Sequence, residues 1–175
     1  MKIFNNNTVL TEAKKRINRL FDDFENVVVG FSGGKDSTVC LNLTLEVAEQ
    51  RGRLPLKVLW IDQEAEWQGT ADYCQSVFND KRVEPWWFQI PMKWHNNVSS
   101  HSEYIYIWQE GAEHIREQSP ISIKENNYLE FGFHEVFEKI FKVHFPDQKS
   151  CYISGVRTQE SPKRFVSLTS SATYE

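Results

Sequence analysis

The chain of 175 residues is 40% hydrophobic and 25% charged, ordinary values for one globular domain with a full core. Its formal net charge of −4 argues against a protein that binds nucleic acid chiefly through phosphate contacts. The three cysteines are scattered without a Cys-x-x-Cys pair, so no disulfide framework, zinc site or iron–sulfur cluster is expected. No segment resembles a signal peptide or a membrane span, which favours a cytoplasmic protein without a membrane partner.

The predicted elements begin with alternating helices and strands. Apolar residues at helical spacing predict an amphipathic helix over residues 10–24. The uninterrupted apolar run at 27–31 is typical of a parallel strand that is buried on both faces. A helix over 36–50, whose apolar stripe includes Val39, and a strand over 57–61 complete the first half.

A second helix–strand pair follows at 67–79 and 83–90, and Pro85 within the strand indicates a sheet edge or a bulge. Successive alternation of this kind predicts a doubly wound α/β fold, with a mostly parallel sheet and helices on both faces. We expect residues 1–175 to form a single domain.

Periodicity is lost from residue 91 to residue 127, where aromatic side chains are frequent. This length is unusual for a connection in a compact domain. Two alternatives remain open: the insertion packs on itself as a lid, or it offers planar side chains to a purine or another flat partner. His95, His101 and His114 lack a recognisable ligand spacing, so no metal site is expected among them.

Acidic side chains follow the strand at 57–61. Asp62 stands directly at its end, and Glu64 and Glu66 come next. Ligands of open parallel sheets bind just beyond the carboxyl ends of the strands, so we expect all three carboxylates to face the site.

The strand at 27–31 leads into Ser-Gly-Gly-Lys-Asp-Ser-Thr at 32–38, a glycine-rich turn before a helix. Adjacent glycines let backbone N–H groups converge on an anion, and a helix N-terminus favours a phosphate group. Further donors are the ammonium of Lys35 and three hydroxyls, those of Ser32, Ser37 and Thr38.

This loop is not a Walker A motif, because Gly30 stands too close to the Gly34–Lys35 pair and Asp36 follows the lysine. The pattern Ser-Gly-Gly-x-Asp-Ser instead resembles the PP-loop of the adenine nucleotide alpha-hydrolase-like superfamily. The resemblance implies an adenine nucleotide, ATP or a related compound, and chemistry at its α–β phosphate bond. The alternative is a simple glycine turn between a strand and a helix.

A further helix is predicted to open at residues 131–134 and to end at Pro146, and a strand at 150–154 leads into a second polar segment. Arginine offers a planar fork suited to phosphate or sulfate. The segment resembles the second motif of the phosphoadenosine phosphosulfate reductase branch, Gly-x-Arg-x-x-Glu-Ser followed by an arginine, whose places are taken by Gly155, Arg157, Glu160, Ser161 and Arg164.

The two motifs together imply one nucleotide site. The resemblance gives catalytic roles to Lys35, Asp36 and Arg157. Mg²⁺ is the candidate metal ion, and Asp36 and Asp62 are its candidate ligands, because hard carboxylate oxygens suit that ion. The residues expected to bind the nucleotide are Ser32, Gly33, Gly34, Lys35, Asp36, Ser37, Thr38, Asp62, Gly155, Arg157, Glu160 and Arg164.

The chain departs from the reductases in one respect. The reductases use a cysteine in a C-terminal Glu-Cys-Gly-x-x-His tail, which this sequence lacks, so we do not expect reduction by this chain alone. It ends soon after the second motif, and we expect either a truncated form or a piece of a longer protein.

Over nearly its whole length the chain looks closer still to the immunoglobulin-binding regulator A type, described as a co-activator of prophage gene expression. This implies an alternative function: a non-enzymatic nucleotide sensor that acts through a protein partner, such as a ParB-like protein.

Overall fold

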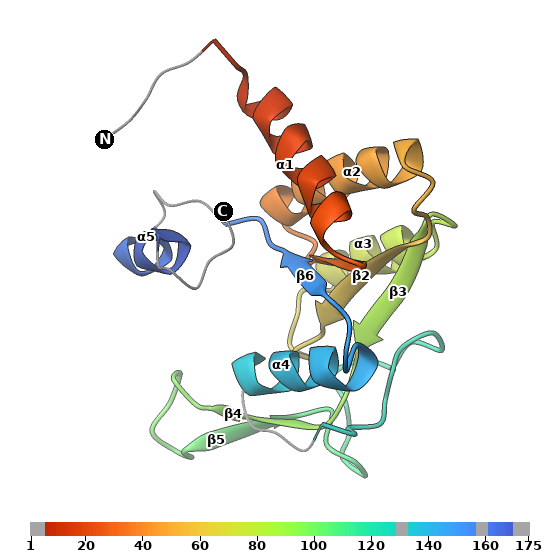
Figure 1. Ribbon diagram of the computed structural model, residues 1–175. Helices are drawn as coiled ribbons and strands as arrows, with labels where there is room; N and C mark the ends of the chain where they lie inside the picture. Colours follow the sequence, from red (N-terminus) through yellow and green to blue (C-terminus); the bar gives the residue numbers. More distant parts are fainter. Residues whose placement is uncertain (1–5, 129–132, 157–160, 170–175) are drawn as a thin grey trace.

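The computed structural model describes residues 6–128, 133–156 and 161–169. Within them, no helix is both long enough and apolar enough to cross a membrane. The strands of a parallel sheet and a separate antiparallel pair alternate with five described helices (Figure 1). Their bounds are α1 Val9–Asp23, β1 Asn26–Gly30, α2 Lys35–Gln50, β2 Leu56–Ile61, α3 Gln68–Phe78, β3 Val83–Phe88, β4 Met92–His95, β5 Tyr104–Ile107, α4 Phe133–His144, β6 Ser150–Ile153 and α5 Pro162–Thr169.

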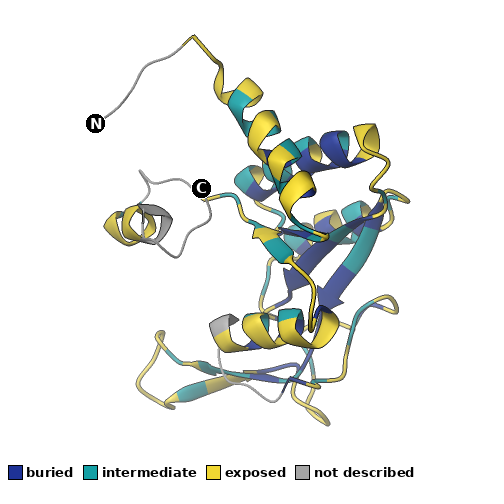
Figure 2. Ribbon diagram, in the orientation of Figure 1, coloured by how far each residue is buried: buried dark blue, intermediate teal, exposed yellow. Residues whose placement is uncertain are grey.

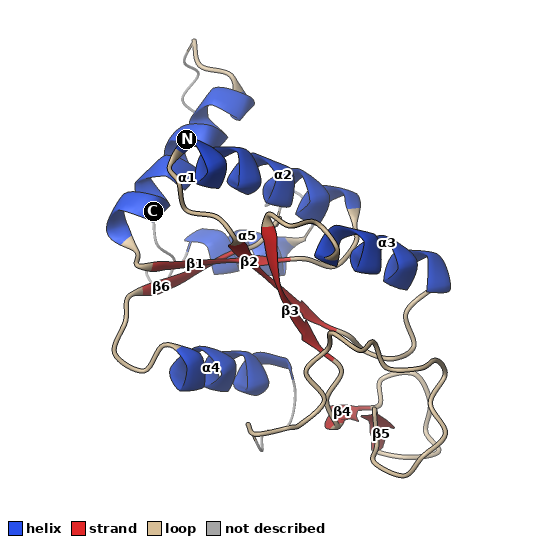
Figure 3. Ribbon diagram, turned by 90° about the vertical axis from the view of Figure 1, so that its right-hand side faces the viewer, coloured by secondary structure: helices blue, strands red, loops and turns tan. Residues whose placement is uncertain are grey.

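The parallel sheet has the strand order β3-β2-β1-β6. Figure 3 shows α1, α2 and α3 on one face and α4 on the other. Side chains of β1 alternate between the two faces: Val27 and Val29 join the core beneath α1, α2 and α3, and Val28 joins the core beneath α4. Burial on both faces explains the uninterrupted apolar run. The predicted doubly wound α/β fold is confirmed.

Two local predictions had different outcomes. Pro85 lies in β3, which is an edge strand of the parallel sheet, as its ring predicted. In contrast, Val39 is 57% exposed, although the sequence placed it on the buried stripe of α2. Val47 and Ala48 are buried as predicted, but Leu41 and Leu45 take the place of Val39, because α2 packs against both the sheet and α1.

The insertion at 91–127 is more regular than the sequence predicts. β4 and β5 pair antiparallel, with Met92 opposite Ile107. Ile123 then forms a parallel bridge to Phe88 at the end of β3, so the insertion continues the sheet edge. Two strands of four residues are too short to produce a clear alternating pattern, which is why the sequence did not reveal them. Figure 2 shows buried residues where this segment meets the sheet and exposed ones along the hairpin.

Candidate functional site

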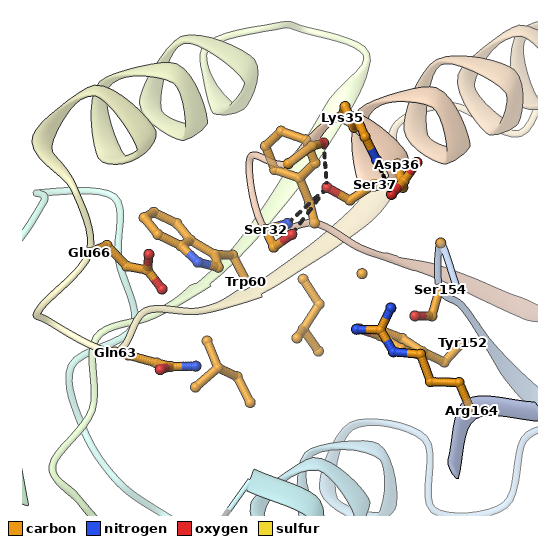
Figure 4. A pocket seen from close by; sticks show the side chains of 16 residues that line it. Ser32, Lys35, Asp36, Ser37, Trp60, Gln63, Glu66, Tyr152, Ser154 and Arg164 are labelled. Atoms are coloured by element: carbon orange, nitrogen blue, oxygen red, sulfur yellow. Dashed lines mark hydrogen bonds and ion pairs between the residues drawn. The ribbon is translucent and has the colours of Figure 1, made fainter. Parts of the chain in front are cut away.

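The segments that follow β1 and β6 meet at one edge of the sheet. β1 lies between β2 and β6, and the helix after β1 and the helix before β6 cover opposite faces (Figure 3). Such a reversal opens a crevice beyond the carboxyl ends of the strands. A cavity of about 500 Å³ lies there (Figure 4), lined by Gly30, Phe31, Ser32, Gly34, Lys35, Asp36, Ser37, Leu59, Trp60, Ile61, Gln63, Glu66, Tyr152, Ser154, Gly155 and Arg164.

The loop before α2 is held in shape by its own polar groups. Gly33 has a φ of +69°, a left-handed conformation that glycine adopts without strain. The Ser37 hydroxyl donates to the Gly34 carbonyl at 2.9 Å and lies 3.2 Å from the Ser32 hydroxyl. The first N–H groups of a helix have no partners within the helix, so this end of α2 is suited to an anion.

The segment after β6 packs against the first turn of α2. A Cβ atom on Gly155 would lie 2.9 Å from the carbonyl carbon and oxygen of Asp36 and 3.2 Å from the backbone nitrogen of Ser37. Contacts this close leave room only for glycine at this position. The structure therefore brings the beginnings of the two sequence motifs into direct contact.

Charged groups of both signs border the cavity. The Lys35 ammonium lies 2.7 Å from a carboxylate oxygen of Asp36, and the lysine side chain is 74% exposed. Arg164 of α5 extends toward the cavity from the opposite side (Figure 4). Burial raises the pKa of Tyr152 to about 12, so its hydroxyl remains a hydrogen-bond donor at neutral pH.

Asp62 does not face the cavity, contrary to the sequence-based expectation. It is fully buried, and its carboxylate accepts hydrogen bonds from Trp87 Nε1 at 3.0 Å, Gln89 Nε2 at 3.0 Å, the Glu64 N–H at 2.9 Å and the Arg116 guanidinium. An ionised carboxylate has about four acceptor positions. All are used here, so Asp62 does not fit the proposed role as a Mg²⁺ ligand.

Glu64 is also turned away from the cavity, and it anchors the insertion. Its carboxylate accepts hydrogen bonds from the N–H groups of Trp108 at 2.5 Å and Ile115 at 3.1 Å, and the Trp108 indole donates to the Asp62 carbonyl at 2.8 Å. Glu64 and Trp108 both have positive φ values, +63° and +49°. Of the three acids that follow β2, only Glu66 lines the cavity.

The structure brings most of the predicted site residues together. Gly33 and Thr38 are not among the lining residues, and the Thr38 hydroxyl donates to the Gly34 carbonyl at 2.8 Å. Arg157 and Glu160 lie outside the described residues. The predicted residues that line the cavity are Ser32, Gly34, Lys35, Asp36, Ser37, Gly155 and Arg164.

Sequence reasoning did not single out three further lining residues, Gln63, Tyr152 and Ser154. The available signal was their position, because each stands at or just beyond the carboxyl end of a parallel strand. That position alone does not show which way a side chain points.

The three thiols are not activated as nucleophiles. Burial raises the pKa of Cys74 and of Cys151 to about 12, and burial followed by the charge of Asp36 raises the pKa of Cys40. A thiol becomes a nucleophile as its thiolate, so these side chains are inert at neutral pH. Within the described residues, no group of three or more His, Cys, Asp and Glu side chains is placed to hold a metal ion.

A family model for the phosphoadenosine phosphosulfate reductase domain matches residues 26–167, which span both motifs and all four parallel strands. The chain belongs to this family. The resemblance seen in the two motifs is therefore confirmed at the level of the family, and a PP-loop domain is the coarse description that the match supports.

A curated relative, the "Uncharacterized protein YbdN" of Escherichia coli (strain K12), is 31% identical to the chain over 93% of the chain's length. The chain spans 42% of the length of that relative.

Proposed function

We propose that this member of the phosphoadenosine phosphosulfate reductase domain family binds ATP or a related adenine nucleotide, with the phosphates at residues 32–37. The observation that carries the proposal is the direct contact between the two motifs at the cavity, where Gly155 packs against the first turn of α2. Helix N–H groups, Lys35 and Arg164 there supply positive potential from several directions. The volume of about 500 Å³ is within the usual range for small-ligand pockets.

The proposed reaction is cleavage of the α–β phosphate bond. The oxygen of an acceptor or of water attacks the α-phosphorus, a new P–O bond forms, the bridging bond to the β-phosphate breaks, and pyrophosphate leaves. Lys35 and the backbone of the loop hold the leaving group as its charge grows. Of the two predicted Mg²⁺ ligands, Asp62 is buried, and Asp36 lines the cavity. Asp36 could hold Mg²⁺, and the ion would neutralise charge on the phosphates. Arg164, with the predicted Arg157, would bind the anionic end of a second group.

Calorimetry with ATP and an assay for released pyrophosphate test this proposal. Lys35→Ala is expected to weaken ATP binding by about tenfold or more, because a charge-assisted contact to phosphate is lost. Lys81→Ala is the matched control, since Lys81 is an exposed lysine that does not line the cavity. A wild-type chain that binds neither ATP nor phosphoadenosine phosphosulfate would contradict the proposal.

The same measurements separate catalysis from the alternative function. Binding of ATP without release of pyrophosphate would favour a nucleotide-sensing co-activator. A pull-down with a ParB-like protein, with and without ATP, would then show whether the nucleotide controls a protein partner. Release of pyrophosphate that requires Lys35 would support the enzyme.

A further inference from the structure

The cavity has a second polar end, away from the phosphate loop. Gln63 and Glu66 line it there, and both come from the short segment between β2 and α3. Figure 4 shows them on the side of the cavity away from Arg164, with Lys35 and Asp36 at the loop. The lining also includes the apolar residues Leu59, Trp60 and Ile61 of β2.

The Glu66 carboxylate has no hydrogen-bond donor within the part of the chain that the structure describes, although the residue is partly buried. Burial raises its pKa, the charge of Asp62 raises it further, and the Arg116 guanidinium lowers it. Because the residue is only partly buried, solvent still reaches this carboxylate at the cavity wall. A ligand in the cavity that brings its own donor can therefore replace that solvent contact with a hydrogen bond to a charged acceptor.

The backbone that carries Glu66 is held from behind. The Arg116 guanidinium donates to the carbonyls of Glu64 and Glu66 and pairs with the Asp62 carboxylate. Arg116 is itself nearly buried, with 11% of its side chain exposed. The carboxylate at the cavity is therefore presented by a rigid support, which selective recognition requires.

We propose that Glu66 selects the base of the bound nucleotide by accepting a hydrogen bond from the exocyclic amine of adenine. The Gln63 amide, three residues earlier, can donate to the neighbouring ring nitrogen N1, and the apolar lining suits the face of a purine. Hypoxanthine presents the opposite pattern, a carbonyl oxygen and an N–H, and its oxygen would meet the carboxylate as a second acceptor. This inference rests on the proposed nucleotide site and assigns its specificity.

Binding of ATP and of inosine triphosphate to the full chain tests the assignment, because the two ligands differ only at the edge of the base. The wild type is expected to prefer ATP by about tenfold or more, the value of a hydrogen bond to a charged acceptor. Glu66→Gln is expected to bring the two affinities within about threefold of each other, because an amide can either accept or donate. Glu49→Gln, which removes the same charge from an exposed position on α2, should keep the wild-type preference.

Inorganic tripolyphosphate reports on the phosphate loop alone, since it carries no base. Its affinity should be the same in the wild type and Glu66→Gln and should fall in Lys35→Ala. A preference for ATP that survives Glu66→Gln, or its absence from the wild type, would overturn the role of Glu66 and leave the nucleotide site standing. Loss of tripolyphosphate binding in Glu66→Gln would also overturn it, because Glu66 would then act on phosphates or a cation. Failure of the wild type to bind either nucleotide would overturn both proposals.

Discussion

Two segments of this chain follow parallel strands of the same sheet, and the structure uses them in opposite ways. Residues 32–38 after β1 direct helix N–H groups and Lys35 toward the cavity. Residues 62–66 after β2 direct Asp62 and Glu64 into the protein, where their carboxylates are buried. The comparison teaches that the carboxyl end of a parallel strand predicts which residues lie near a site. Whether their side chains can reach a ligand depends on which other segments pack against them.

The difference comes from the insertion. The donors that occupy the two buried carboxylates include the Arg116 guanidinium and the N–H groups of Trp108 and Ile115, all more than forty residues further along the chain. The hydroxyl groups of residues 32–38 instead have hydrogen-bond partners within five residues, and Tyr73 of α3 adds one distant donor to Thr38. If this comparison is correct, substitutions in the first segment change binding and substitutions in the second change folding.

The largest expected effect is that of Asp62→Ala, which should lower the free energy of unfolding by about 3–5 kcal/mol, the cost of breaking a buried ion pair. Arg116 would stay buried without its carboxylate, and the side-chain donors of Trp87 and Gln89 would lose their acceptor. Urea denaturation followed by circular dichroism measures this. Asp147→Ala, at an exposed aspartate, should change the value by less than about 0.5 kcal/mol.

Equal free energies of unfolding for the Asp62 and Asp147 variants would contradict the structural role of Asp62. Its carboxylate would then be available to a ligand. Lys35→Ala belongs to the same series. Its ion pair with Asp36 is exposed, so this variant should stay within about 0.5 kcal/mol of the wild type while losing ATP affinity.

Glu64→Gln gives a smaller and more local effect. The remaining oxygen of the glutamine still accepts one of the two backbone N–H groups, but its new amide nitrogen faces the second N–H, and both are donors. An unsatisfied buried donor costs about 1–3 kcal/mol. Hydrogen exchange followed by NMR should show faster exchange at the amides of Trp108 and Ile115, with unchanged exchange in α2. Uniformly faster exchange over the whole chain would mean that Glu64 supports the global fold and not the docking of the insertion.

The sequence predicted the sheet and the glycine-rich turn before α2 because local patterns in the sequence determine both. The apolar run of β1, the glycine pair and the helix after it lie within one short stretch. The fate of Asp62 could not be predicted in the same way, because Arg116 stands in a segment without periodicity and nothing local links the two. Tyr152 was missed for a related reason: its strand was visible, but the face that meets the cavity depends on the neighbouring β1.

The smallest expected effect concerns Glu66, the one acid of the second segment that belongs functionally with the first. Only the ionised carboxylate discriminates between the two bases, because a protonated carboxyl group can either accept or donate, as an amide can. The pKa of Glu66 is raised by burial and by the charge of Asp62, against the opposing charge of Arg116. As the pH falls from 7 through this raised pKa, the preference for ATP over inosine triphosphate should decline, earlier than for an ordinary carboxyl group. The ratio cancels the titration of the triphosphate, which both ligands share, and Glu66→Gln should show no such decline.

The sign of the same shift predicts a stability effect. A carboxyl group whose pKa is higher in the folded than in the unfolded state favours folding below its unfolded pKa, and this contribution is lost as the pH rises through the folded pKa. At neutral pH the ionised Glu66 is therefore a cost to the ligand-free protein, and Glu66→Gln should unfold at a slightly higher temperature than the wild type. A lower melting temperature would instead mean that Glu66 stabilises the fold together with Asp62 and Glu64. All three acids that follow β2 would then have a structural role, including the one that lines the cavity.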